Sequence, residues 1–164
     1  MPKAQLSDPD LIDRLRQEWE RESPKLDTHA MDVVGRVMLL ANRWDSQVQQ
    51  TLKPFKLTYT DFDILATLRR SGAPYELTPT QLLQSVLLTS GAMTTALARL
   101  EDAGLIARIE DPNDRRSKKA GLTRKGVSLA GKAANKRFET AGVQLEKLSE
   151  GERRTLTKLL RKML

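Results

Sequence analysis

Apolar residues recur at helical spacing through most of the chain. Leu11, Leu15 and Trp19 stand four residues apart, and this stripe predicts a first helix over residues 8–23. A second helix is predicted over residues 28–53, where the apolar residues keep helical spacing: Met31, Val34, Met38, Ala41, Val48 and Leu52. A long helix with a broad apolar face often packs against a partner subunit.

Polar residues with capping chemistry mark the helix starts. A hydroxyl that caps a helix is often followed, three residues later, by an acid or amide that caps in return. Thr58 with Asp61, Thr78 with Gln81 and Ser149 with Glu152 fit this pattern, while Asp8, Thr89 or Ser90, and Thr123 are expected to cap without it. Glycines at 72 and 104 can end helices in a left-handed conformation. The spacing predicts helices from about 58 to 71, 78 to 88, 90 to 103, 123 to 148 and 149 to 164.

Two of these helices, over residues 78–88 and 90–103, are joined by a tight turn, which is the helix-turn-helix pattern. Residues 105–109 and 118–122 read as strands, and Asp111-Pro112-Asn113-Asp114 between them is a turn sequence. A hairpin placed directly after the second helix is a wing. The predicted fold is therefore mainly α with a small β-hairpin wing, a winged helix-turn-helix.

Composition removes several classes of function. The 164 residues include no cysteine and one histidine, His29, which excludes disulfides, thiolate zinc sites and multi-histidine sites, so we expect no metal and no cofactor. No catalytic triad, Walker or dinucleotide-binding arrangement is present, so we expect no enzyme. The N-terminus has no apolar run of a secretion signal, and no stretch approaches membrane-spanning length, so we expect a cytoplasmic protein.

Positive charge is concentrated in the wing. The net charge is +7, and residues 104–126 hold seven Lys and Arg against three Asp and Glu, which is +4 of that total. A basic balance favours polyanionic partners such as nucleic acid. Arg115 and Arg116 at the hairpin tip suit a narrow minor groove, and Lys118 suits a phosphate. Asp114 is expected to brace the tip.

The helix over residues 90–103 has two different faces. Met93, Leu97 and Leu100 fall on the side expected to be buried, and the opposite face is small and hydroxylated. Such a slim face lets a helix enter a major groove. The candidate DNA-contact residues are Thr89, Ser90, Gly91, Thr94, Thr95 and Ala98 on this helix, with Arg115, Arg116 and Lys118 on the wing.

These segments together resemble the MarR family of bacterial regulators. The matching motifs are Asp114-x-Arg116, Leu122-Thr123, Lys125-Gly126, and residues 90–94 and 100–105. The resemblance implies a homodimer on pseudopalindromic duplex DNA, commonly a repressor released by a small aromatic anion or phenol. It divides the chain into an added N-terminal helix (1–27), a dimerisation helix (28–56), the DNA-binding domain (57–123) and C-terminal dimerisation helices (124–164).

The added N-terminal helix is similar to that of the urate-responsive, PecS-type branch of the family. That branch implies an effector site of Trp19, Asp63 and Arg108, with Ala96 where a second arginine is expected. A pocket with one arginine fewer favours a singly charged aromatic acid or phenol over urate. Packing of Trp19 and an ion pair between Asp63 and Arg108 are the structural alternatives.

Two other functions fit the same fold. The first is a DNA-binding regulator with no small-molecule effector. The second is a winged-helix module that binds proteins, which predicts an acidic or neutral wing instead of the basic one seen here.

Overall fold

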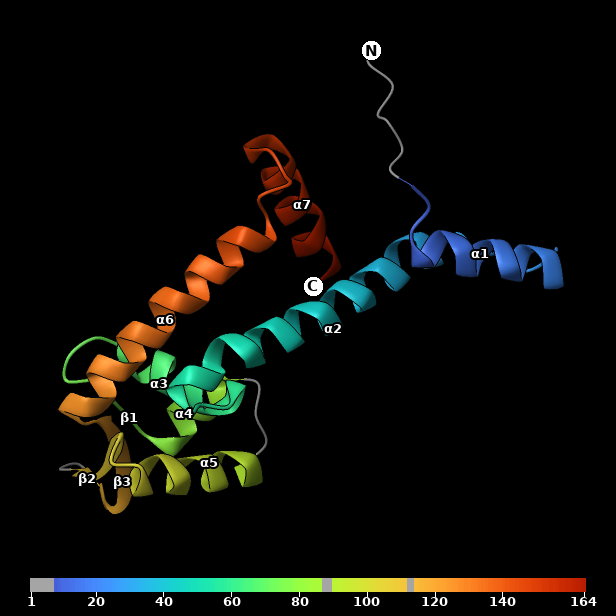
Figure 1. The fold of residues 1–164 in the computed structure, drawn as a ribbon. Coiled ribbons are helices and arrows are strands. Elements are labelled where there is room, and N and C mark those ends of the chain that lie inside the picture. The colour runs from blue at the N-terminus through green and yellow to red at the C-terminus, as the bar shows by residue number, and fades with distance from the viewer. Residues whose placement is uncertain (1–7, 87–89, 112–113) are drawn as a thin grey trace. The chain divides into compact units, whose positions relative to one another are not determined.

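The structure is a computed structural model that describes residues 8–86, 90–111 and 114–164 (Figure 1). The chain divides into two compact units, residues 1–47 and 48–164. Helix α1 (Leu11–Glu22) and most of helix α2 (Met31–Leu52) lie in the first unit. The second unit holds the end of α2 and everything that follows.

The prediction that Asp8 caps α1 without a capping box is wrong, because the helix starts two residues later at a capping box. Asp10, not Asp8, is the N-cap, and Asp13 caps in return. The guanidinium of Arg36 on α2 binds both carboxylates, at 2.9 Å from Asp10 and 2.6 Å from Asp13. The hydrogen bond from Arg36 also lowers the pKa of Asp13 below its usual value. These contacts hold α1 against α2.

After a short 3₁₀ turn (Lys53–Phe55), the second unit continues with the winged helix-turn-helix predicted over residues 57–123, which we call the reading head. Its helices are α3 (Tyr59–Arg70), α4 (Pro79–Ser85) and α5 (Ser90–Asp102). The capping boxes predicted at Thr58 and Thr78 are confirmed. Gly72 and Gly104 have φ angles of +83° and +66°, so the predicted left-handed stops are confirmed as well.

The wing is confirmed and is larger than predicted. Strands β2 (Ile106–Asp111) and β3 (Asp114–Leu122) pair antiparallel, with a register irregularity after Glu110. A two-residue strand, β1 (Glu76–Leu77), pairs with the other edge of β3 and gives the order β1-β3-β2. Strand β1 was not predicted, because two residues carry no alternating pattern.

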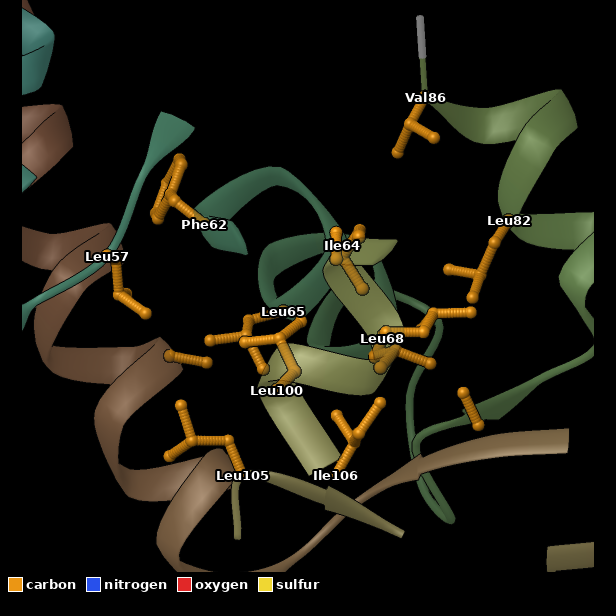
Figure 2. Close-up of a cluster of buried hydrophobic side chains, with 14 of the residues drawn as sticks. Leu57, Phe62, Ile64, Leu65, Leu68, Leu82, Val86, Leu100, Leu105 and Ile106 are labelled. Carbon is orange, nitrogen blue, oxygen red and sulfur yellow. The ribbon is translucent and has the colours of Figure 1, made fainter. Parts of the chain in front are cut away.

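One apolar core joins these elements. Figure 2 shows side chains of α3 surrounded by side chains of α4, α5 and the start of β2. The predicted buried residues of α5, Met93, Leu97 and Leu100, are each at most 2% exposed. This core holds α5 and the wing together as one body.

Helix α6 (Arg124–Gln144) leaves the base of the wing, and α7 (Glu150–Met163) ends the described chain. Thr123 caps α6 as predicted, and its hydroxyl donates to the Gly104 carbonyl at 2.8 Å. Helix α6 ends at Gln144, four residues before the predicted Leu148. Within the described residues, no helix combines the length and apolar character needed to cross a membrane.

Candidate functional site

The outer face of α5 has the character that its sequence predicts. Gly91, Thr94, Thr95 and Ala98 are all exposed, at helical spacing along one side. The Thr95 hydroxyl donates to the Gly91 carbonyl at 3.2 Å, so its methyl group remains available to a partner. Residues 90–98 carry no charged and no amide side chain. A helix with this face presents methyl and hydroxyl groups to whatever it enters.

The wing places Lys118 on β3, opposite Glu110 of β2, with the Lys118 side chain exposed. Arg115 and Arg116 belong to the same strand. Their side chains, that of Ser90 and the whole of Thr89 lie outside the described residues. The backbone of β3 therefore brings the predicted wing contacts onto one strand, which pairs with β2, and β2 contacts α5.

The alternative of an ion pair between Asp63 and Arg108 is wrong. Arg108 instead binds Glu101 of α5, with its Nε 3.3 Å from the carboxylate. This bond joins the base of the wing to the last turn of α5. In this structure Arg108 therefore links two elements of the reading head, β2 and α5.

Asp63 lies in a pocket between α3 and α6. The cavity is about 400 Å³, a size typical of small-molecule sites. Burial raises the pKa of the half-buried Asp63 carboxyl, and the charge of Arg70 opposes that rise. Three aromatic residues, three arginines, three alanines and Asp63 line the pocket: Tyr59, Phe62, Asp63, Ala66, Arg69 and Arg70 of α3, and Ala134, Arg137, Phe138 and Ala141 of α6.

Arg137 is the least satisfied of these arginines. Its Nη1 is buried and has no hydrogen-bond partner among the residues that the structure describes. Arg69 donates to the Val127 carbonyl at 3.1 Å, and Arg70 donates to the Ser85 carbonyl at 2.8 Å. A buried guanidinium nitrogen without a hydrogen-bond partner costs stability, and an anion bound beside it would supply the missing acceptor. Arg137 was not predicted as a site residue, because a lone arginine on an amphipathic helix gives no signal of its own.

Trp19 is the third residue of the predicted effector set. It lies on α1 in the first unit, and its side chain is 48% exposed. The pocket residues all belong to the second unit. Of the three predicted residues, Asp63 alone is among the residues lining the pocket.

Metal chemistry finds no support in the part of the chain that is described. No three His, Asp or Glu side chains there are grouped so that they could hold a metal ion. The site is built from an exposed helix face, a basic strand and a pocket with cationic and aromatic walls.

Comparison with known proteins gives a consistent assignment. A family model described as the MarR family matches residues 57–118, which span α3 through most of the wing. The HTH-type transcriptional regulator PecS of Dickeya dadantii is 35% identical over 144 residues, which cover 88% of this chain and 87% of PecS. This match also includes part of the chain outside the reading head.

Solved structures share the fold. A cysteine-to-serine mutant of MarR from E. coli, complexed with operator DNA, has a TM-score of 0.70 at 25% identity, covering 95% of this chain and 99% of that one. BpsR of Bordetella bronchiseptica, whose DNA binding is regulated by 6-hydroxynicotinic acid, has a TM-score of 0.71 at 27% identity, covering 82% and 95%.

Proposed function

Since this chain belongs to the MarR family of DNA-binding transcriptional regulators, we propose that it represses transcription from a pseudopalindromic operator that it binds as a homodimer. The observation that carries this proposal is the exposed, slim face of α5 directly followed by a basic hairpin. The family members to which the chain is similar are regulators of transcription and not enzymes.

The two parts of the reading head have different tasks in this proposal. Helix α5 enters the major groove, where Thr94 and Thr95 contact base edges and Ser90 meets a phosphate near the helix start. The wing reaches the backbone and minor groove with Arg115, Arg116 and Lys118. Each phosphate contact releases a counterion, so the affinity falls steeply with salt.

Dimerisation is supported by apolar side chains that the single chain leaves uncovered. On α6 and α7 these are Phe138, Val143, Leu159, Leu160 and Met163, and Phe138 is 74% exposed. An exposed apolar patch of this kind marks an interface between proteins. A two-fold dimer presents two copies of α5 to half-sites about 10 bp apart, or a multiple of that spacing.

The pocket between α3 and α6 supports a small aromatic acid or phenol as the effector. Arg137 would hold the anionic group, and Phe62 and Phe138 would contact the ring. The similarity to BpsR, which responds to a hydroxylated aromatic acid, points to the same class of ligand. The ligand releases DNA only if it binds the DNA-incompetent conformation more tightly than the competent one.

Footprinting of the upstream and divergent promoter with the purified protein tests the DNA half of the proposal. The expected result is a protected segment with two related half-sites at moderate salt. A protein-interaction module would give no protected segment, and that outcome would sink the regulator claim.

A thermal-shift panel of salicylate-like, nicotinate-like and urate-like compounds tests the effector half. We expect an aromatic acid to raise the melting temperature and to release the operator in a mobility-shift titration. The variant Arg137→Ala should lose both responses, and Lys136→Ala, an exposed neighbour on α6, should keep them. A flat response across the panel would favour a regulator without an effector.

A further inference from the structure

One buried carboxylate connects α3 to α5. The Asp61 side chain is 3% exposed, and Arg99 of α5 reaches it with two nitrogens. The Arg99 Nη2 lies 2.6 Å from Oδ1, and the Nε lies 3.1 Å from the same oxygen and 3.3 Å from Oδ2. A two-nitrogen contact of a guanidinium with a carboxylate fixes direction as well as distance.

The same carboxylate is built into the start of α3. Its Oδ2 accepts hydrogen bonds from the Thr58 backbone amide at 2.9 Å and from the Thr58 hydroxyl at 2.7 Å. Asp61 therefore has a fixed position before Arg99 binds to it. Arg99 is anchored to a rigid point of the scaffold instead of to another mobile side chain.

Arg99 Nη2 also lies 3.5 Å from the Thr58 hydroxyl, and apolar side chains make further contact between α3 and α5. Leu65 and Leu100 both take part in the shared core (Figure 2). The buried apolar stripe of α5 sets which face of the helix turns to the core, but apolar contacts are non-directional, and the bond to Asp61 adds a directional restraint on the rotation of α5 about its axis. A rotation of this helix would turn the face of Thr94 and Thr95 away from the groove.

We propose that Asp61 and Arg99 form a positioning pair, in which a buried carboxylate of α3 holds α5 in the orientation that reads the operator. This proposal rests on the DNA-binding function proposed above. Arg99 acts through Asp61 and makes no contact with DNA, although it is the one cationic residue of α5 and its side chain is 49% exposed. The obvious alternative for such an arginine is a direct contact with a phosphate.

Salt dependence separates the two roles. A phosphate contact supports binding to every DNA sequence, and its loss lowers the slope of log affinity against log salt by about one. A positioning pair supports binding to the operator only. Its loss lowers the ratio of operator to non-specific affinity and leaves the salt slope unchanged.

The experiment measures Kd for the footprinted operator and for a scrambled duplex of equal composition, over a range of salt, with the full-length protein. We expect Arg99→Ala and Asp61→Asn to weaken operator binding about 5- to 100-fold, the range for loss of a good base contact, without changing binding to scrambled DNA. Arg99→Lys keeps the charge and loses the two-nitrogen geometry, so it should fall between wild type and Arg99→Ala.

A matched control addresses stability. Glu152→Gln removes the corresponding carboxylate from the capping box of α7, which has no part in this pair. It should leave the ratio of operator to scrambled affinity at the wild-type value. If Glu152→Gln lowers that ratio as much as Asp61→Asn does, general destabilisation explains the effect and the pair has no positioning role.

Three further results contradict the positioning pair and leave the proposed DNA-binding function unaffected. Arg99→Ala could weaken both duplexes and lower the salt slope by about one, which assigns Arg99 to a phosphate. Arg99→Ala could leave the operator affinity unchanged. If Asp61→Asn does not fold, the variants at the half-exposed Arg99 decide alone. Arg99→Lys and wild type could then have the same ratio of operator to scrambled affinity, which contradicts the need for the two-nitrogen contact. A wild-type protein that binds both duplexes equally would instead contradict the proposed function itself.

Discussion

At the scale of single residues, the half-buried position of Asp63 disfavours the ionised form of its carboxyl group. Burial in the pocket raises the pKa of its carboxyl, and the field of Arg70 only partly opposes this effect. The folded protein therefore binds the Asp63 proton more tightly than the unfolded chain does. The ionised side chain costs stability at neutral pH, and the cost disappears as the pH falls toward the unfolded pKa of about 4.

The variant Asp63→Asn should accordingly melt at a higher temperature than wild type at pH 7. The difference should shrink as the pH is lowered to about 4, because wild-type Asp63 then also becomes neutral. Thermal melts across this pH range measure both effects. A variant that melts below wild type at pH 7 would show that the Asp63 carboxylate is stabilising.

Glu152 provides a comparison of opposite sign. Hydrogen bonds from Ser149 lower the pKa of its carboxyl, so it contributes stability above its unfolded pKa and loses that contribution as the pH falls. Glu152→Gln should lower the melting temperature at pH 7 and approach wild type in acid. The two variants together separate a site carboxylate from a structural one.

At the scale of elements, the joint between wing and α6 depends on Gly126. A Cβ at this position would fall well inside contact distance of the Leu105 carbonyl oxygen, which is backbone and cannot turn aside. We expect Gly126→Ala to destabilise the protein by about 1–3 kcal/mol, the usual cost of overpacking.

Gly142, on the same helix, is the matched control. Apart from its chain neighbours and the backbone of its own helix, no described atom lies within 4 Å of the place where its Cβ would stand. Gly142→Ala should therefore stabilise the helix by about 0.5–1 kcal/mol, since alanine loses less backbone entropy than glycine. Denaturant titrations of both variants give the two values, and equal effects of the two substitutions would refute the close approach at Gly126.

Local chemistry explains which elements the sequence predicted well. Capping boxes and left-handed glycines act through neighbouring residues, so the ends of α3, α4 and α5 follow from the sequence within a few positions. The start of α1 was placed wrongly because Asp8 and Asp10 both offer a capping carboxylate, and only the structure shows that Asp10 and Asp13 cap each other.

The candidate site was predictable where it lies within one element. The exposed face of α5 follows from helical spacing, and the resemblance singled out Asp63. The partner of Arg108, the unsatisfied Arg137 and the bond between Asp61 and Arg99 depend on how distant segments pack. Asp61 and Arg99 are 38 residues apart, and no spacing rule connects such positions.

At the scale of the whole molecule, the proposed function requires two chains on one operator. Leu159 of α7 is 55% exposed in the single chain, on the apolar stripe assigned to the dimer. Leu159→Glu should convert the dimer to a monomer in sedimentation experiments and weaken operator binding by more than about tenfold, because the second half-site no longer binds as part of one molecule.

Lys158→Glu, on the opposite face of α7, changes the charge more and should leave the dimer intact. A monomeric wild-type protein would contradict this interface. So would a dimer that Leu159→Glu does not disturb.

The most direct measurement is a binding titration with three duplexes: the footprinted operator, the same operator with one half-site scrambled, and one with both scrambled. We predict two chains bound per operator and a large loss of affinity when a single half-site is scrambled. The fully scrambled duplex should bind at least about a thousandfold more weakly than the operator at physiological salt. Equal affinity for all three duplexes would contradict sequence-specific binding by a dimer of winged helices.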